Sequence, residues 1–215
     1  MINLGFHGIG APERGLEPDE DQYWIDAPRF EELLDTALEL PEVRLTFDDG
    51  NTSDLSVALP MLVERGLTAS FFVIAGWLGQ PGSLAADDVR ALAEAGMTIG
   101  THGMQHRSWR SLDEEGYREE LDEAREVLEA AAGARIDEAA CPYGAYDRRA
   151  LRALKRREFR RVYTVDRRTA GPDDWLQARY VIRRSDTANT VRGFGGESAP
   201  RKLTLAAKTT VKRWR

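Results

Sequence analysis

The sequence has a single cysteine and no long apolar run, and these two features exclude an internal disulfide and a membrane-spanning segment. Cys141 is the only cysteine, so no disulfide can form within the chain, which favours a reducing compartment. No apolar run is long enough to span a bilayer, and no charged-then-apolar segment resembling a secretory signal opens the sequence. We therefore expect a cytoplasmic protein.

An excess of positive charge is also missing. The formal net charge is −6, and no nucleic-acid-binding motif is present, so we expect no nucleic-acid partner. Basic residues do gather in 148–168 and in the tail 208–215. Such runs are typical of solvated helix faces, and contact of the tail with an anionic membrane surface is the alternative. The sequence does not indicate an oligomeric state.

The 215 residues are enough for one sizeable core, and no linker or repeat divides them. Apolar runs bounded by glycine alternate with segments of helical periodicity. This alternation predicts an α/β fold with a parallel sheet and crossover helices, either open or closed into a barrel. We expect one domain over residues 1–215, in which about 1–184 carry the motifs and 185–215 form a C-terminal helical extension. Strands are expected at 1–5, 43–47, 68–74, 97–99, 138–141, 161–165 and 180–182.

Unusual polar residues follow several of these strands. In parallel α/β folds the carboxyl ends of the strands form the functional face, so we expect these residues to converge there. They are His7, the pair Asp48 and Asp49, the pair His102 and His106, the Pro142-Tyr143 step, and Asp166.

The two histidine positions have metal-ligand spacing. His102 and His106 are four residues apart, so both rings can meet one ion if the segment forms a helical turn. A carboxylate from Asp49 would complete three protein ligands and leave a position open, as in catalytic rather than structural sites. Asp48 would then be free to act as a general base on a metal-activated water molecule. The alternative is an Asp-Gly turn with two histidines that are merely hydrogen-bonded.

The residues that carry this chemistry also carry a family resemblance. Thr46-Phe47-Asp48-Asp49-Gly50, followed by Thr101-His102-Gly103-Met104-Gln105-His106, resembles the first two motifs of the polysaccharide deacetylases, the NodB-homology group also called carbohydrate esterase family 4. Cys141-Pro142-Tyr143-Gly144 is similar to the third motif, a proline-aromatic loop that lines the groove. The resemblance covers about residues 1–182.

The resemblance implies a fold and a set of roles. The fold is a single-domain, incomplete or distorted (β/α) barrel of about seven units. Asp48 is the general base, and Asp49, His102 and His106 bind a divalent metal, usually Zn²⁺, with Co²⁺ or Ni²⁺ as alternatives. The backbone N–H of Tyr143 donates to the oxyanion that forms on the acyl carbonyl, where such donors are most effective.

The sequence departs from the family pattern at two places. Many members have an arginine two residues before the proline of the third motif, and here that position is Ala140. Arg179, Arg183 and Arg184 are candidates for the missing role of steadying the base, and the sequence does not choose among them.

The second departure concerns the general acid. No histidine follows His106, although the family usually supplies a late one. His7, in Phe6-His7-Gly8-Ile9, resembles the opening of those members whose last motif stands near the N-terminus. An imidazole suits proton donation near neutral pH, so we assign His7 as general acid, with a structural or substrate-orienting role as the alternative.

Weaker candidates surround this set. Pro142 and Tyr143 are expected to line the substrate groove. Among the tryptophans Trp77, Trp109 and Trp175, we expect Trp109 to stack on a sugar, because it follows the histidine motif closely. Asp166 would hydrogen-bond substrate or cap a turn. Cys141 is more typical of a small buried apolar residue than of a nucleophile.

Together these residues predict a metal-dependent hydrolase that removes an N-acetyl or other N-acyl group from an amino sugar. The substrate would belong to a polysaccharide, an oligosaccharide or a linked precursor. Three alternatives stay open: a deformylase acting on a lipid-linked sugar, an amidase acting on a non-sugar amide, and an inactive carbohydrate-binding module.

Overall fold

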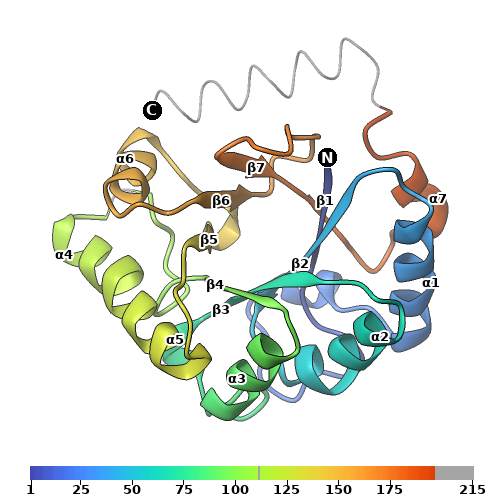
Figure 1. Cartoon of the computed structure of the whole chain (residues 1–215), viewed down its shortest axis with the longest axis horizontal. Helices are drawn as coiled ribbons and strands as arrows, with labels where there is room; N and C mark the ends of the chain where they lie inside the picture. Colours follow the sequence, from blue (N-terminus) through green and yellow to red (C-terminus); the bar gives the residue numbers. More distant parts are fainter. Residues whose placement is uncertain (111, 197–215) are drawn as a thin grey trace.

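The computed structural model describes residues 1–110 and 112–196, and its centre is one curved parallel sheet. Eight strands run in the order β7-β6-β5-β4-β3-β2-β1-β8. Helices surround the outside of this sheet, so the fold is a nearly closed (β/α) barrel (Figure 1). The strands are β1 (Ile2–Phe6), β2 (Val43–Asp49), β3 (Ala69–Val73), β4 (Thr98–Thr101), β5 (Glu138–Ala140), β6 (Arg161–Thr164), β7 (Leu176–Ala178) and β8 (Tyr180–Val181).

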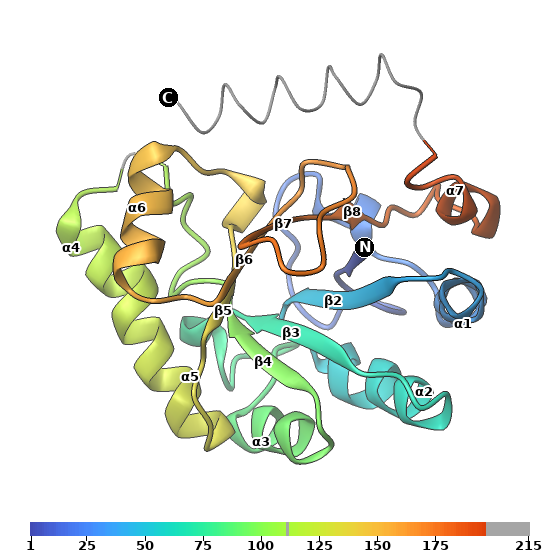
Figure 2. The ribbon, with the colours of Figure 1, turned by 45° about the horizontal axis from the view of Figure 1, so that its top comes forward.

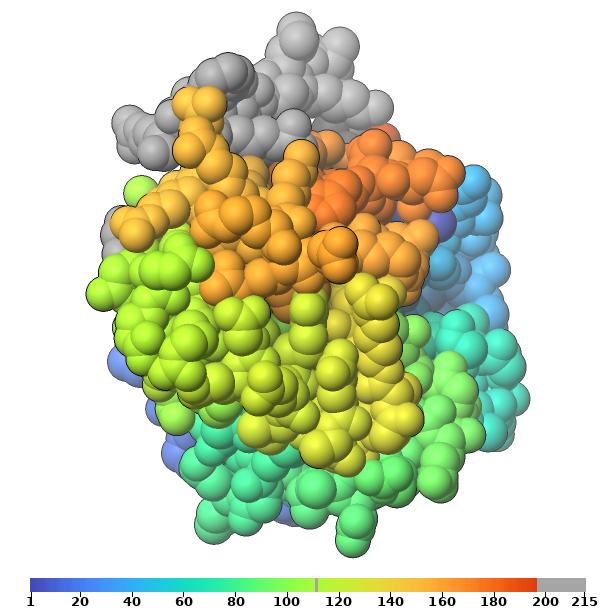
Figure 3. All heavy atoms as spheres, turned by 60° about the vertical axis from the view of Figure 1, so that its left-hand side comes forward, coloured from blue at the N-terminus to red at the C-terminus, as the bar shows by residue number. Residues whose placement is uncertain are grey.

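The helices are amphipathic and bury their apolar faces against the sheet. In α1, Asp26 caps the first turn by accepting a hydrogen bond from the Arg29 N–H at 2.7 Å. Figure 3 shows side chains from residues of about 105–175 covering one outer face of the barrel. The α-helices are α1 (Ala27–Leu38), α2 (Leu59–Glu64), α3 (Ala86–Glu94), α4 (Glu114–Tyr117), α5 (Ala124–Ala132), α6 (Arg148–Arg156) and α7 (Ala188–Arg192), and π-helical turns at Asp54–Ala58 and Arg118–Glu123 precede α2 and α5.

A row of aromatic rings on the outer face of the sheet shows, by alternation along the strands, which residues point into the barrel. Strand register aligns Phe6 with Phe47 and Phe47 with Phe71, and the neighbouring rings stack at 5.3 and 4.6 Å. Phe30 of α1 meets Phe6 edge-on at 5.2 Å, so this row points outward to the helices. Because side chains alternate along a strand, Thr46 and Asp48 of β2 point into the barrel.

One extended segment nearly closes the barrel. β7 pairs with β6, and β8 pairs with β1 on the far side of the sheet. The two short strands are separated only by Arg179, and no ladder joins them within the described residues, so an unsealed seam remains there (Figure 2). The chain thus crosses the seam at Arg179, whose side chain is fully buried.

The expected α/β barrel is confirmed, with differences at its C-terminal part. The sequence analysis predicted the β8 region but missed β7, which is only three residues long. The predicted extension at 185–215 contains α7, and the residues of that extension from 197 onward, including the basic tail, lie outside the described residues. Over the ranges that the structure covers, no helix is long and apolar enough to cross a membrane.

Candidate active site

A cavity of about 370 Å³ opens at the carboxyl ends of the strands. The side chains that the sequence placed after β1, β2, β4 and β5 converge on it, as expected for this edge of a parallel sheet. Residues of the long loop between β1 and α1 form another wall. The predicted site residues that line the cavity are His7, Asp48, Asp49, His102, His106 and Tyr143.

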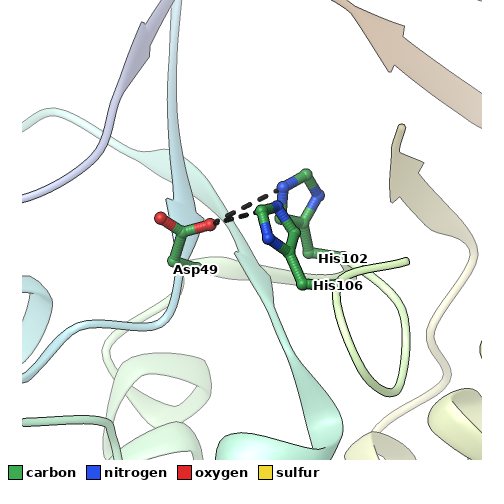
Figure 4. Close-up of side chains that lie close together, drawn as sticks. All are labelled: Asp49, His102 and His106. Atoms are coloured by element: carbon green, nitrogen blue, oxygen red, sulfur yellow. Dashed lines mark ion pairs between the residues drawn. The ribbon is translucent and has the colours of Figure 1, made fainter. Parts of the chain in front are cut away.

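Asp49, His102 and His106 form a compact group (Figure 4). The Nε2 atoms of His102 and His106 lie 3.7 and 3.9 Å from Asp49 Oδ1. Two ligand atoms about 2 Å from one tetrahedral ion lie about 3.3 Å apart, so small side-chain movements would bring this group onto an ion. Asp49 Oδ1 is buried and has no hydrogen-bond partner among the described residues, which is unusual for a carboxylate oxygen. The group therefore fits a divalent metal.

Hydrogen bonds at the other ring nitrogens orient both imidazoles. His102 Nδ1–H donates to the Ala140 carbonyl at 2.9 Å, and His106 Nδ1–H donates to Glu17 Oε2 at 3.1 Å. In this tautomer each Nε2 carries a lone pair directed toward Asp49. Burial lowers the pKa of His102 to about 4, with the neighbouring His106 acting in the same direction. His102 is therefore neutral at pH 7, as a metal ligand must be.

The segment that carries the two histidines is a loop, whereas the sequence analysis required a helical turn. Gly103 and His106 have left-handed backbones, with φ of 92° and 53°. The buried carboxylate of Glu120 accepts hydrogen bonds from the Met104 and Gln105 N–H groups at 3.2 and 3.1 Å. A Cβ atom at Gly103 would lie 2.3 Å from Glu120 Oε2, so glycine is needed for this carboxylate to shape the loop.

Asp48 and Asp49 line the same cavity although they are adjacent on β2. Asp49 has a φ of 79°, and this left-handed residue ends the strand's alternation of faces. Asp48 is held by Arg179, with Nη1 to Oδ1 at 2.6 Å and Nη2 to Oδ2 at 2.7 Å. Burial favours the protonated acid, but the Arg179 guanidinium and His102 outweigh it and hold the pKa of Asp48 well below its usual range.

Arg179 is thus the arginine that contacts Asp48. Of the three arginines left open by the sequence, Arg183 is exposed and Arg184 donates to the Trp24 and Asp21 carbonyls of the β1–α1 loop. Arg179 also donates to Thr46 Oγ1 at 3.1 Å. It reaches Asp48 from the seam rather than from the β5 position occupied by Ala140.

His7 faces the cavity from the end of β1. Its ring stacks on Tyr23 with centroids 5.0 Å apart. Its Nδ1 atom is buried and has no hydrogen-bond partner among the residues that the structure describes. The structure places this imidazole in the same cavity as Asp48, where the general-acid assignment requires it.

Tyr143 lies in an aromatic cluster over the site. Its backbone is left-handed at φ 56°, and its side chain is 59% exposed. The ring lies 4.4 Å from that of His106, and Trp77 meets His106 edge-on at 5.8 Å. Burial, together with the hydrogen bond from the Tyr143 hydroxyl to Glu17, raises the pKa of Tyr143 to about 12. The phenol therefore stays neutral.

The structure contradicts the expected position of Trp109. This side chain is fully buried in a core cluster with Tyr117 and Leu121, so it cannot stack on a sugar, and Trp77 is the tryptophan that lines the cavity. Trp175 packs against the same core cluster and donates to the Phe159 carbonyl.

Two further predicted groove residues do not line the cavity. Pro142 is buried. Asp166 accepts hydrogen bonds from the Tyr146 hydroxyl at 2.7 Å and from Thr164 Oγ1 at 2.9 Å. Asp166 therefore supports the loop after β6, and neither side chain is placed to contact substrate in the cavity.

Sequence reasoning missed the contribution of the β1–α1 loop. Glu17 Oε2 accepts from both His106 Nδ1 and the Tyr143 hydroxyl, at 3.1 and 3.0 Å. Arg14 Nη2 lies 3.5 Å from Asp49 Oδ2 and also pairs with Glu20. The loop was recognised only as polar, because no local pattern ties these charges to residues that follow far along the chain.

Comparisons with known proteins agree with this geometry. The family model described as polysaccharide deacetylase matches residues 37–162, more than half of the chain. The peptidoglycan-N-acetylglucosamine deacetylase of Bacillus cereus is 31% identical over 104 residues, which are 48% of this chain and 36% of that protein. The chain spans half or less of the length of the curated relatives it matches.

Two solved structures share the fold over nearly the whole chain. The Streptococcus pyogenes deacetylase PplD, solved in complex with acetate, has a TM-score of 0.76 and 18% identity, and the match covers 90% of this chain and 97% of PplD. IcaB from Ammonifex degensii has a TM-score of 0.73 and 21% identity, covering 91% and 97% of the two chains. From the family match over more than half of its length, the chain belongs to the polysaccharide deacetylase family.

Proposed function

We propose that this chain is a metal-dependent hydrolase that removes an N-acetyl group from an amino sugar of a polysaccharide, oligosaccharide or linked precursor. One observation carries the proposal. The Nε2 atoms of His102 and His106 converge on an unpartnered oxygen of Asp49, and Asp48, held as an anion by Arg179, lines the same cavity. Family membership supports the same chemistry.

Asp49, His102 and His106 would hold the ion, for which two nitrogen ligands and one oxygen ligand favour Zn²⁺, with Co²⁺ and Ni²⁺ as alternatives. The chemistry that a bound divalent ion supplies here is Lewis acidity, which lowers the pKa of a water molecule and polarises the acyl carbonyl. The open position left by three protein ligands suits a catalytic rather than a structural ion.

The chain's own groups would carry the proton transfers. Asp48 is the general base that accepts the proton from the attacking water, and Arg179 fixes both of its oxygens. The backbone N–H of Tyr143 would donate to the oxygen on which negative charge develops. His7 would donate a proton to the leaving amine, because it is the remaining imidazole that lines the cavity.

The test is release of acetate from an N-acetylglucosamine tetramer by protein incubated with Zn²⁺, Co²⁺ or Ni²⁺. We expect acetate from the wild type, and at least about a hundredfold less from Asp48→Asn, since a general base contributes about 10²–10⁴-fold to rate. Asp173→Asn, an exposed aspartate outside the cavity, is the matched control and should retain full activity. Equal rates for Asp48→Asn and the wild type would refute the assignment of the base.

A further inference from the structure

The cavity has a basic side that the proposed deacetylation does not use. Arg167, in the loop after β6, and Arg183, just after β8, both line the cavity. Within the described part of the chain, neither guanidinium has a carboxylate oxygen within 4.0 Å. These two arginines therefore bring positive charge to the cavity without an internal counter-ion.

The carboxylates that line the cavity belong to Glu17, Asp19, Glu20, Asp48 and Asp49. Asp48 is paired with Arg179, Glu20 with Arg14, and Glu17 accepts from His106 and Tyr143. Among the described residues, none of these carboxylates has an oxygen within 4.0 Å of the Arg167 or Arg183 guanidinium, so both arginines stay available to a ligand. Two guanidinium groups that border one cavity and have no carboxylate partner are suited to an anionic ligand group, which arginine can bind with two parallel hydrogen bonds.

Arg183 and the proposed general acid, His7, have Tyr23 as a common neighbour. The Arg183 guanidinium carbon lies 5.9 Å from the centre of the Tyr23 ring, and the His7 ring stacks on the same tyrosine with centroids 5.0 Å apart. Arg183 therefore borders the part of the cavity that contains His7. The turn that presents Arg183 is fixed, because Asp186 Oδ2 accepts from the Arg183 N–H at 2.9 Å.

Arg167 is held more rigidly. Its backbone is left-handed at φ 50°, and its N–H donates to the Arg179 carbonyl at 3.0 Å. Its Nη1 donates to the Val181 carbonyl at 3.2 Å, two residues before Arg183. Because one guanidinium nitrogen is fixed on the β8 backbone, Arg167 retains other N–H donors for a ligand.

We propose that the substrate carries an anionic group, a carboxylate or a phosphate, within about one sugar unit of the N-acetyl group, and that Arg183 and Arg167 bind it. This inference rests on the proposed deacetylase function for the identity of the acyl group. The anionic group lies away from the reacting carbonyl, so its binding lowers KM and leaves kcat nearly unchanged. A neutral N-acetylated oligosaccharide lacks this contact.

The test measures binding and turnover separately with three tetrasaccharides. The first is the neutral N-acetylglucosamine tetramer, the second alternates N-acetylglucosamine with carboxylate-bearing N-acetylmuramic acid, and the third is the N-acetylglucosamine tetramer with a 1-phosphate. Calorimetric titration of zinc-loaded protein gives Kd, and acetate release gives KM and kcat. The carboxylate and the phosphate arms distinguish the two sources of negative charge.

For the wild type we expect at least one charged tetrasaccharide to bind about tenfold tighter than the neutral one, roughly the value of one hydrogen bond to a charged group. Arg183→Glu should abolish this difference, and it should leave folding intact, since the Arg183 side chain is exposed and its loss opens no core cavity. Arg135→Glu makes the same charge change at an exposed position before β5, at the other end of the barrel, and should retain the preference.

Equal affinity of the wild type for all three tetrasaccharides, or equal effects of Arg183→Glu and Arg135→Glu, would overturn the inference. Failure of the proposed function looks different: no acetate is released from any tetrasaccharide, while the charge preference and its dependence on Arg183 persist. Acetate release from all three with one common KM would instead retain the function and reject the anionic substrate.

Discussion

Arg179 and Asp48 form a buried, doubly hydrogen-bonded ion pair inside the barrel, with N···O distances of 2.6 and 2.7 Å. Arg179 comes from the crossing between β7 and β8, and Asp48 from the end of β2. The pair therefore links the seam of the barrel to the proposed catalytic base. Because both partners are buried, removal of either one should strongly destabilise the fold, since the remaining charge would be desolvated without a counter-ion.

Replacement of Arg179 by methionine should destabilise the protein and impair catalysis together. The variant leaves Asp48 buried without its counter-ion, which costs about 3–5 kcal/mol when one partner of a buried pair is removed. Urea unfolding monitored by circular dichroism measures the change in unfolding free energy.

A second substitution separates the ion pair from general loss of packing. In the double variant Arg179→Met/Asp48→Asn the unpaired charge is gone, so this protein should be more stable than Arg179→Met alone. If Arg179→Met cost the same unfolding free energy in the wild type as in the Asp48→Asn background, the two residues would not be coupled as the structure indicates.

Glu17→Gln should weaken metal binding without removing a ligand. The Glu17 carboxylate accepts from His106 Nδ1, and loss of such an outer partner typically lowers metal affinity about 10–100-fold. Competition with a chromophoric chelator measures the zinc Kd. Tyr143→Phe removes the other hydrogen bond to Glu17 and leaves the histidine contact, so its zinc Kd should change by less. The same Kd for Glu17→Gln and the wild type would contradict this positioning role.

Asp54→Asn should stabilise the protein relative to the wild type, and this gain should be larger at pH 8 than at pH 4. Burial, with the charges of Asp49 and Asp48, raises the pKa of Asp54 well above its usual value. The folded state therefore binds more protons than the unfolded state above about pH 4, and stability falls as pH rises through that window. The asparagine variant has no proton to lose, so its gain in Tm should grow with pH, whereas exposed Asp173→Asn should show no such trend.

Replacement of Trp77 should weaken substrate binding, whereas replacement of Trp109 should lower the stability of the fold. Trp77→Ala removes a cavity wall and should raise KM for the N-acetylglucosamine tetramer severalfold, as expected for loss of an aromatic contact of about 0.5–1.5 kcal/mol. Trp109→Ala opens a cavity in the core and should cost about 3–5 kcal/mol of unfolding free energy. A raised KM in Trp109→Ala with unchanged stability would mean that the tryptophan assignments are reversed.

Residues whose placement depends on strand direction could be predicted from the sequence. Asp49 and His102 follow strands of one parallel sheet, so their convergence is a consequence of topology. His106 was expected from its spacing, but its path was not, because the left-handed turn depends on Glu120, which lies beyond the loop in sequence. Spacing alone does not distinguish a helical turn from a loop of similar reach.

Residues placed by long-range contacts could not be chosen from the sequence. Arg179 was one of three arginines near the last strands, and only the closure of the barrel at the seam points it at Asp48. Glu17 reaches His106 across 89 positions of sequence. Trp109 was misassigned because closeness to a motif in sequence does not determine whether a side chain faces the cavity or the core.

The central claim is that Asp49, His102 and His106 hold one divalent ion. Elemental mass spectrometry of the wild type and of His106→Ala, each incubated with Zn²⁺ and dialysed, tests it most directly. The account predicts about one zinc ion per wild-type chain and a large loss in the variant, since removal of one of three protein ligands leaves only two. Absence of retained metal in the wild type with Zn²⁺, Co²⁺ and Ni²⁺ alike, or equal retention by His106→Ala, would contradict it.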